Sequence, residues 1–257
     1  MKTAIIGYTG FVGGNISDQH TFDDYYNSSN ISNIEDKEYD LIVSAANRAD
    51  MWRINQEEEK DLAEIKDFIG HLEKVRAKKL VLISTVGVYK SPNGADEDTP
   101  IDTDGLTPYG KNRYYMEEYC RRNFDTTIIR LPGLFGKGLK KNVIYDLLHD
   151  NMVEKIHKDG MYQYYNLANI WKDTEVGLKN NLPLVNLAVP PVSTEEVAQY
   201  AFGMEYTNAP ADIKPAYWDM HSKYADVYGG EGDYLYTKQQ ELDDLKDFVT
   251  SERRGAA

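Results

Sequence analysis

Short apolar runs alternate with longer amphipathic segments over the first two-thirds of the chain. The short runs have the length of buried strands, and several contain the β-branched residues that strands favour. Between them, apolar residues recur at intervals of three or four, as at Leu62, Ile65 and Phe68, which predicts helices that bury one face. We expect strands at residues 3–6, 39–46, 79–85 and 126–131, and helices at residues 11–18, 55–76 and 109–123.

This alternation of strands and helices, with strands apolar on both faces, is typical of a parallel sheet covered by helices on both sides. Because crossovers between parallel strands are right-handed, the order predicts an α/β, doubly wound fold of the Rossmann type. After about residue 137 the pattern weakens, and a smaller α+β part is expected there. The predicted organisation is a core at residues 1–137 and a smaller part, interleaved with it, at residues 138–257.

The smaller part carries one clear helix signal. Ser193 and Glu196 have the spacing of a capping box, which predicts a helix at residues 193–202. Further helices are expected at residues 142–149 and 239–249, with a short strand at residues 184–187 and a frayed end at residues 251–257.

Glycines 7, 10 and 13 follow the first predicted strand directly and lead into the first predicted helix. Such a turn brings unpaired backbone N–H groups and the positive end of the helix dipole to one point, which suits a pyrophosphate. Glycine is needed because a Cβ would block the close approach of the backbone. We interpret the turn as the pyrophosphate site of a dinucleotide; the alternative is a turn that merely packs tightly.

The end of the second strand is where such folds read the adenosine ribose of the dinucleotide. An acid there favours NAD, whereas a basic or small polar residue tolerates the 2′-phosphate of NADP. If the strand ends near Tyr26, Asn27 with Ser28 contacts the ribose; if it ends earlier, Asp23 or Asp24 could do so. The choice between NAD and NADP therefore stays open.

Two hydroxyls, Ser84 and Thr85, lie at the carboxyl end of a predicted strand, the edge where ligands bind in open α/β sheets. Further along, Tyr109 and Arg113 stand at i and i+4 on one helix and share a face. A phenol is a poor base at neutral pH, but a neighbouring cation favours the phenolate. Tyr109 can then exchange a proton while hydride moves to or from a nicotinamide, and Thr85 would hold the substrate oxygen. The alternative is that Tyr109 is one of 20 tyrosines on an ordinary amphipathic helix.

Together these segments resemble the extended short-chain dehydrogenase/reductase superfamily, in its NAD-dependent epimerase/dehydratase group. The layout is most similar to the reductase branch that acts on deoxysugar nucleotides. The resemblance implies an NAD(P)-dependent oxidoreductase or epimerase that acts on a nucleotide-activated sugar, held by the smaller part. The matching segments occur in family order and are GYTGFVGG (Gly7–Gly14), DLIVSAA (Asp40–Ala46), Asn55, LISTVGVY (Leu82–Tyr89), PYGKNR (Pro108–Arg113) and RLPGLFGKG (Arg130–Gly138).

The resemblance also implies roles for single residues. Tyr109 matches the catalytic tyrosine, Thr85 the hydroxyl residue that acts with it, and Asn142 a contact to the sugar-nucleotide diphosphate. Helices 55–76 and 109–123 would pair two subunits into a homodimer. With the residues argued above, the predicted cofactor contacts are Gly7, Thr9, Gly10, Phe11, Val12, Asn27, Ser28, Ala45, Ala46, Ser84, Arg113 and Pro132, and the predicted interface stripe is Tyr115, Tyr119 and Cys120.

One departure from the family concerns Arg113, because the family has a lysine there that hydrogen-bonds the nicotinamide ribose. Arginine keeps the charge permanently, but its planar fork is larger and differently placed. Lys111 is two residues away and points elsewhere on the helix. We expect Thr85, Tyr109 and Arg113 to be the catalytic residues. Because Arg113 replaces the family lysine, the alternative function is a catalytically weak or silent NAD(P)-binding redox sensor.

Composition narrows the partners. With 29 basic and 42 acidic residues the net charge is −13, which argues against nucleic acid or an anionic membrane as partner. No run approaches the length of a membrane span and no targeting segment is evident, so we expect a cytoplasmic protein. Cys120 is the only cysteine and the five histidines show no ligand spacing, so we expect no disulfide, no metal site and an inert, buried thiol.

Overall fold

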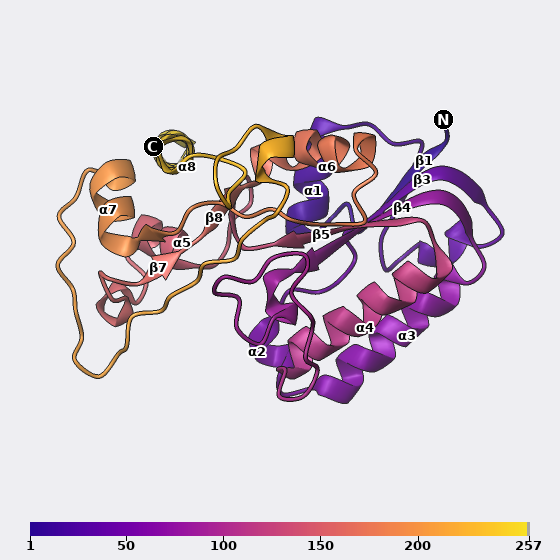
Figure 1. Cartoon of the computed structure of the whole chain (residues 1–257), viewed down its shortest axis with the longest axis horizontal. Coiled ribbons are helices and arrows are strands. Elements are labelled where there is room, and N and C mark those ends of the chain that lie inside the picture. Colours follow the sequence, from indigo (N-terminus) through magenta and orange to yellow (C-terminus); the bar gives the residue numbers. More distant parts are fainter. Residues whose placement is uncertain (256–257) are drawn as a thin grey trace. The chain divides into compact units, whose positions relative to one another are not determined.

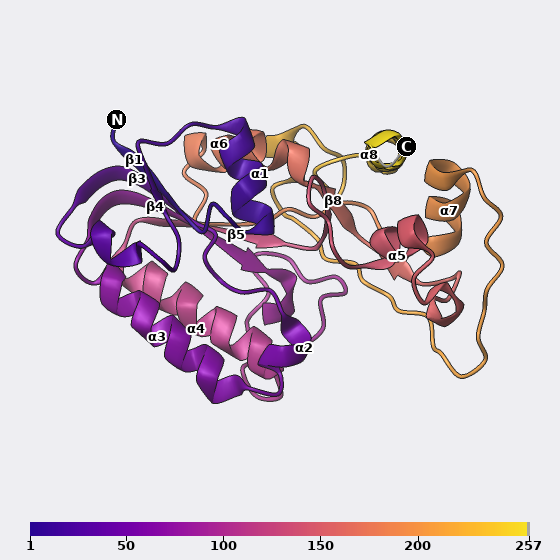
Figure 2. The same ribbon diagram turned by 180° about the vertical axis from the view of Figure 1, so that it is seen from behind.

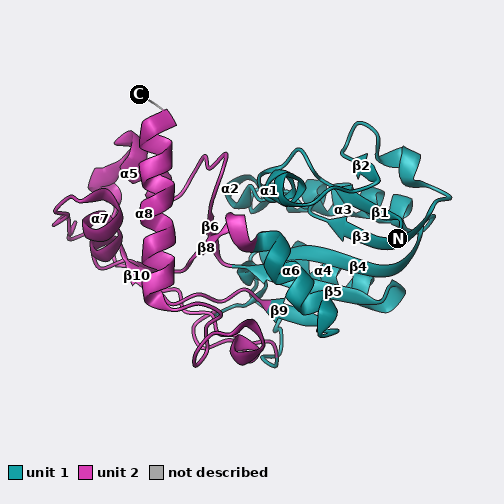
Figure 3. Ribbon diagram, turned by 90° about the horizontal axis from the view of Figure 1, so that it is seen from above, with its two compact units in different colours: residues 1–91, 98–131, 170–185 teal, residues 92–97, 132–169, 186–257 magenta. Residues whose placement is uncertain are grey.

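The computed structural model describes residues 1–255, and the chain divides into two compact units (Figure 3). The first unit does not end at residue 137 as expected. The chain leaves it briefly at Pro92–Glu97 and again after Leu131, and returns at Ile170–Val185, which supplies one helix and most of an edge strand. The first unit comprises Met1–Ser91, Asp98–Leu131 and Ile170–Val185, and the second comprises Pro92–Glu97, Pro132–Asn169 and the chain from Asn186 onward.

A six-stranded sheet is the centre of the first unit (Figure 1). Its strands are β1 (Thr3–Ile6), β2 (Asp24–Tyr26), β3 (Glu38–Ser44), β4 (Arg76–Thr85), β5 (Thr126–Leu131) and β9 (Leu184–Asn186). The order across the sheet is β2-β1-β3-β4-β5-β9. β1 pairs in parallel with both β2 and β3, β3 with β4, and β4 with β5. The predicted doubly wound α/β fold is confirmed.

Helices cover both faces of this sheet. They are α1 (Phe11–Gln19), α2 (Met51–Ile54), α3 (Glu58–Leu72), α4 (Pro108–Asn123) and α6 (Ile170–Lys179). α3 and α4 lie side by side on one face, and α1 and α6 lie together on the other (Figures 1 and 2). The helix expected at residues 55–76 ends earlier, because Arg76 is already paired with Glu38 in the sheet.

The core under α4 corrects one expectation. Cys120 is completely buried and packs with Met116 and Ile128, so it does not belong to an outward stripe. Tyr119 is partly buried, and Tyr115 is 44% exposed. Cys120 faces the sheet, and burial raises the pKa of its thiol to about 12. The expectation of a buried thiol is confirmed.

The strand order reverses at β1, because β2 lies on one side of it and β3 on the other. In open α/β sheets, ligands bind outside the carboxyl ends of the strands at such a reversal point. The loops that follow Ile6 and Ser44 leave the sheet there. The topology therefore predicts a ligand site at the glycine turn and at the residues after β3.

The second unit contains the helices α5 (Val143–His149), α7 (Thr194–Phe202) and α8 (Lys238–Gly255). Its short strands are β6 (Gly133–Phe135), parallel to β8 (Tyr164–Asn166), and β7 (Met161–Tyr162), antiparallel to β10 (Val192–Ser193). No helix within residues 1–255 has the length and apolarity needed to cross a bilayer.

Side-chain hydrogen bonds fix the start of α7 and join the end of α8 to α7. The predicted capping box is confirmed, since Ser193 Oγ accepts from the N–H of Glu196 and the Glu196 carboxylate accepts from the N–H of Ser193. Fraying from residue 251 was wrong for residues 251–255, because Arg253 donates to the Phe202 carbonyl at 3.2 Å and so ties the end of α8 to α7. Residues 256–257 lie outside the described residues.

Candidate active site

The glycine turn depends on close contacts between backbone atoms. Gly7 has a φ of +89°, and a Cβ there would lie 2.5 Å from the carbonyl oxygen of Ala45 and 2.8 Å from the nitrogen of Ala46. A Cβ on Gly13 would lie 2.1 Å from the carbonyl oxygen of Gly7. Only glycine fits at both positions, so the turn presses α1 and the end of β3 against one another.

The start of α1 has the features of an anion site. Gly10 is the N-cap residue and contributes no capping side chain, and the first turn holds no acidic residue. The N–H groups of a first turn have no partner inside their own helix, and the dipole there attracts negative charge. Thr9 and Gly10 are exposed, and Phe11 and Val12 are half-buried. These residues fit the pyrophosphate of a dinucleotide.

Both acids considered for the adenosine ribose are held by the sheet. The Asp23 carboxylate accepts the N–H of Thr3 at 2.6 Å, which lowers the pKa of Asp23. The Asp24 carboxylate accepts the hydroxyl of Tyr39 at 2.6 Å. Because β2 ends at Tyr26, the structure favours the other alternative, in which the residues after the strand face the ribose.

Asn27 and Ser28 are the residues that follow β2. The Asn27 side-chain oxygen accepts from the N–H of Ser29 at 2.9 Å and from its hydroxyl at 2.6 Å, and this fixes the turn. The Asn27 side-chain nitrogen lies 3.5 Å from the hydroxyl of Tyr8, so the turn also contacts the glycine loop. An amide carries no charge, and the position therefore favours neither NAD nor NADP by electrostatics.

The first turn of α4 packs against the turn that follows β4. A Cβ on Gly110 would lie 2.2 Å from the carbonyl oxygen of Gly87, so these two backbones touch. Thr107 caps the helix by accepting the N–H of Gly110 at 3.2 Å, and Pro108 is compatible with the first turn. Asn55 Oδ1 accepts the N–H of Tyr109 at 3.0 Å. The contact of Gly110 with Gly87 and the hydrogen bond to Asn55 together fix the position of Tyr109.

The Tyr109 ring and the Thr85 hydroxyl converge beside Gly87. A Cβ on Gly87 would lie 3.1 Å from Cε1 of Tyr109 and 3.4 Å from Oγ1 of Thr85. Thr85 Oγ1 accepts the N–H of Gly87 at 3.0 Å, which fixes its rotamer. Tyr109 is 5% exposed. The phenol ring and the hydroxyl of Thr85 therefore border the same small space.

Arg113 lies against the same phenol. Its guanidinium carbon is 5.0 Å from the centre of the Tyr109 ring, and the side chain is only 2% exposed. Nη2 donates to Asp61 Oδ1 at 2.7 Å, whereas Nε and Nη1 are buried and lack a partner within residues 1–255. An unsatisfied buried donor costs about 1–3 kcal/mol, so these nitrogens fit a bound group with acceptor oxygens.

Ser84 does not share this arrangement. Its hydroxyl is buried and donates to Glu117 Oε1 at 2.5 Å. The same carboxylate holds Arg130 through hydrogen bonds of 3.0 and 2.6 Å, and Arg130 also donates to Tyr89 Oη at 2.7 Å. The side chain of Ser84 therefore faces Glu117 of α4, which corrects the expectation of a cofactor contact through its hydroxyl. Successive residues of a strand point to opposite faces, so Thr85 and Ser84 could not both face the ligand edge.

Three further residues considered from the sequence are Lys111, Pro132 and Asn142. Lys111 is on the exposed side of α4, 3.8 Å from Glu58, and so does not replace the family lysine. Pro132 is the first residue of a segment of the second unit. Asn142 caps α5 by accepting the N–H of Tyr145 at 3.1 Å and donates to the Leu134 carbonyl at 2.8 Å. Roles for Pro132 and Asn142 stay predictions.

Two residues of the cluster were missed by the sequence. Asp61 and Asn112 are 6% and 2% exposed, and Asn112 donates to Asp61 Oδ2 at 2.9 Å. A signal existed for Asp61, because it stands four residues before the buried Ile65 and so lies on the apolar stripe of α3. An acid on such a stripe indicates a buried partner.

Comparisons with known proteins agree with the fold. Residues 23–173, more than half of the chain, match the NAD dependent epimerase/dehydratase family. No curated protein matches the chain. Solved structures of similar fold include MoeE5 in complex with UDP-glucose and NAD (TM-score 0.75, 13% identity, covering 100% of each chain), a UDP-galactose 4-epimerase (0.74, 14%, 99% of each chain) and the dTDP-4-dehydrorhamnose reductase of Bacillus anthracis in complex with NADP (0.71, 15%, 97% of this chain and 99% of that one).

Proposed function

Because this chain belongs to the NAD-dependent epimerase/dehydratase family, we propose that it is an NAD(P)-dependent oxidoreductase or epimerase of a nucleotide-activated sugar, with Tyr109 as its proton donor and acceptor. Membership of this family makes it an enzyme that uses a nicotinamide dinucleotide. Complexes of similar structures with UDP-glucose and NAD, and with NADP, support the substrate class and leave either cofactor possible.

One observation carries the proposal, namely the convergence at Gly87. A buried phenol and a hydroxyl border the same space, and a guanidinium with two unused nitrogens lies against the phenol. Phenol and hydroxyl together suit an oxygen that changes between alcohol and carbonyl. The glycine turn, which fits a pyrophosphate, lies in the same unit and at the same carboxyl edge of the sheet.

The dinucleotide, when bound, supplies hydride transfer to or from its nicotinamide ring. Tyr109 gives its proton to a substrate carbonyl oxygen as that oxygen becomes an alcohol, or takes the proton in the reverse direction. Thr85 holds the same oxygen by a hydrogen bond, and the Arg113 guanidinium lies against the face of the phenol ring, 5.0 Å from its centre. The residues proposed to hold the dinucleotide are Gly7, Thr9, Gly10, Phe11, Val12, Asn27, Ser28, Ala45, Ala46, Arg113 and Pro132.

The test compares Tyr109→Phe with Tyr115→Phe, a control on the same helix whose side chain is 44% exposed. Turnover is followed by cofactor absorbance with a panel of UDP- and dTDP-hexoses, and dinucleotide binding by calorimetry. We expect Tyr109→Phe to lower kcat by about 10²-fold or more, the usual share of a general acid–base, while the dissociation constant of the dinucleotide stays unchanged. Tyr115→Phe should match the natural protein.

Other outcomes would contradict the proposal in different ways. Natural turnover in Tyr109→Phe would remove the proton-transfer role. A protein that binds the dinucleotide but turns over no sugar nucleotide, and gains turnover in Arg113→Lys, would favour the redox-sensor alternative. Absence of binding to NAD and NADP in either redox state would remove the function altogether.

The homodimer remains part of the proposal. α3 and α4 lie side by side on one face of the sheet, and Tyr115 exposes 44% of its surface there. Exposed aromatic side chains of this size are enriched at interfaces. Light scattering on the purified protein should give twice the chain mass, and Tyr115→Glu should shift it towards the monomer.

A further inference from the structure

A buried group of three side chains joins α3 to α4 behind the Tyr109 ring. Arg113 Nη2 donates to Asp61 Oδ1 at 2.7 Å, and the Asn112 side-chain nitrogen donates to Asp61 Oδ2 at 2.9 Å. The same nitrogen of Asn112 also donates to the carbonyl of Glu58 at 3.1 Å. Both carboxylate oxygens of Asp61 therefore accept hydrogen bonds, and the guanidinium of Arg113 is held at Nη2.

This fixation determines what Arg113 can offer. A guanidinium is planar and rigid, so a hydrogen bond at Nη2 and packing on the Tyr109 ring set the direction of Nε and Nη1 as well. Both are buried and unpaired among residues 1–255, and burial without a partner is costly. An arginine held in this way is prepared for a ligand with hydroxyl or other acceptor oxygens.

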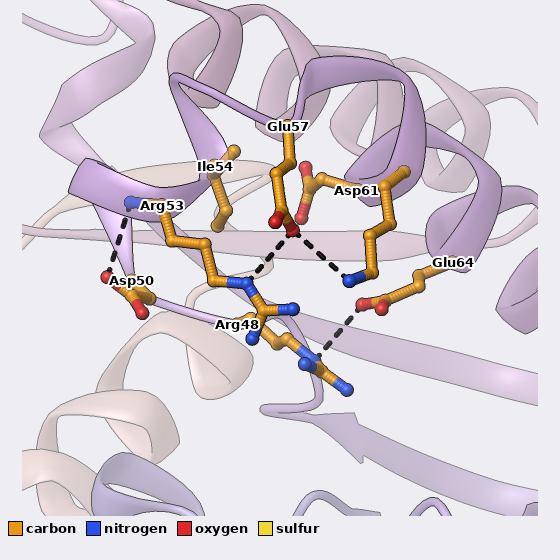
Figure 4. A pocket seen from close by; sticks show the side chains of 8 residues that line it. Arg48, Asp50, Arg53, Ile54, Glu57, Asp61 and Glu64 are labelled. Carbon is orange, nitrogen blue, oxygen red and sulfur yellow. Dashed lines mark hydrogen bonds and ion pairs between the residues drawn. The ribbon is translucent and has the colours of Figure 1, made fainter.

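Asp61 also compensates the charge of Arg113. An unpaired buried cation is strongly unfavourable, whereas a hydrogen-bonded pair is tolerated. Asp61 lines a small pocket, about 50 Å³ in volume, between α2 and the first turns of α3 (Figure 4). The cations of that pocket pair with other acids, Arg53 and Lys60 with Glu57 at 3.0 and 3.2 Å and Arg48 with Glu64 at 3.1 Å. Asp61 instead accepts hydrogen bonds from the buried side chains of Asn112 and Arg113, and its negative charge balances that of Arg113.

We propose that Asp61 is the positioning residue that makes an arginine effective beside Tyr109. It occupies Nη2, balances the charge of Arg113 and leaves Nε and Nη1 for the hydroxyl oxygens of the nicotinamide-side ribose. The inference rests on the proposed function. Asp61 and Arg113 form a matched pair, because a lysine at position 113 would have to share one ammonium group between the carboxylate and the ligand.

The experiment measures dissociation constants of two ligands by calorimetry. One is the dinucleotide, NAD or NADP, whichever the natural protein binds; the other is ADP, which lacks the nicotinamide half and reports on the glycine turn and the contacts to the adenosine half. We expect Asp61→Asn to weaken dinucleotide binding about tenfold or more, as for loss of a charge-assisted contact, and to leave ADP binding unchanged. Arg113→Lys should give the same selective loss.

Two further variants keep the outcome interpretable. Glu64→Gln alters an acid of the same helix and the same pocket that pairs with Arg48, and it should change neither affinity. Asp61→Glu retains the carboxylate one methylene further out, and should restore part of the dinucleotide affinity lost in Asp61→Asn. If Asp61→Asn does not fold, Asp61→Glu against the natural protein carries the test, with a selective loss of dinucleotide affinity expected.

The results separate the two proposals. A natural protein that binds neither NAD nor NADP overturns the proposed function and this inference with it. A natural protein that binds the dinucleotide, with Asp61 variants that lose ADP and dinucleotide affinity equally or lose neither, overturns the role of Asp61 alone. A lower melting temperature without the selective loss would likewise mean that Asp61 only stabilises the fold.

Discussion

Alanine at Gly13 should disrupt the packing of α1 on the glycine turn, whereas alanine at the adjacent Gly14 should not. A Cβ on Gly13 would lie 2.1 Å from the carbonyl oxygen and 2.7 Å from the carbonyl carbon of Gly7. A Cβ on Gly14 would lie 3.5 Å from the carbonyl oxygen of Tyr8, an ordinary contact. Because non-bonded atoms rest at about 3.5 Å, α1 must retreat by about 1 Å in the first variant and not at all in the second.

The magnitudes follow from two opposing effects. Replacing glycine by alanine inside a helix stabilises it by about 1 kcal/mol, and both positions lie inside α1. Overpacking costs about 1–3 kcal/mol, and the upper end applies at Gly13 because backbone atoms cannot turn away as a side chain can. We expect the free energy of unfolding to fall by about 2 kcal/mol in Gly13→Ala and to rise by about 1 kcal/mol in Gly14→Ala.

Binding should change in the same direction. A shift of about 1 Å moves the first-turn N–H groups away from the pyrophosphate and lengthens their hydrogen bonds to it, so the affinity for the dinucleotide should fall. Urea unfolding gives the stabilities, and calorimetry with NAD and NADP gives the affinities. Equal stability and equal affinity in Gly13→Ala and Gly14→Ala would refute the view that this turn is built on backbone contact.

Three further predictions concern buried charges and the thiol. Cys120 should react with a disulfide reagent only after unfolding, because burial raises the pKa of its thiol to about 12; rapid reaction of the folded protein at about pH 8 would contradict this. Burial holds the pKa of Glu241 well above its ordinary value of 4.5, so the folded state keeps a proton that the unfolded chain releases, and stability falls as the pH rises above that value. Glu241→Gln should flatten this fall in urea unfolding at a series of pH values, and identical slopes would count against it. Arg130→Met leaves the fully buried Glu117 without its bidentate partner and should lower the free energy of unfolding by about 3–5 kcal/mol, a loss that chemical denaturation would detect.

Patterns over a few neighbouring residues were enough to predict the sheet and the glycine turn. Thr3–Ile6 and Thr126–Leu131 are strands as expected, since a run that is apolar on both faces fits only the middle of a covered sheet. The Ser193 capping box and the contact between Gly13 and Gly7 are equally local, because each joins residues close in sequence. Such features are determined by sequence spacing alone.

The sequence pattern did not determine the direction in which individual side chains point. The pattern at the end of β4 did not reveal that Ser84 faces Glu117 while Thr85 reaches Gly87, because alternation gives two faces without saying which one binds a ligand. Helical spacing likewise did not separate the buried Cys120 from the exposed Tyr115. The packing partners of each face decide these questions.

The tertiary structure alone determined the environment of the proposed catalytic tyrosine. The sequence by itself places Tyr109 and Arg113 on one helical face, one turn apart, through the 3.6-residue period. It does not reveal that Arg113 pairs with Asp61, 52 positions earlier in the chain, or that two of its nitrogens stay without a partner within residues 1–255. Helical periodicity acts over three or four residues, whereas a buried ion pair forms only where folding brings two helices together and removes water from between them.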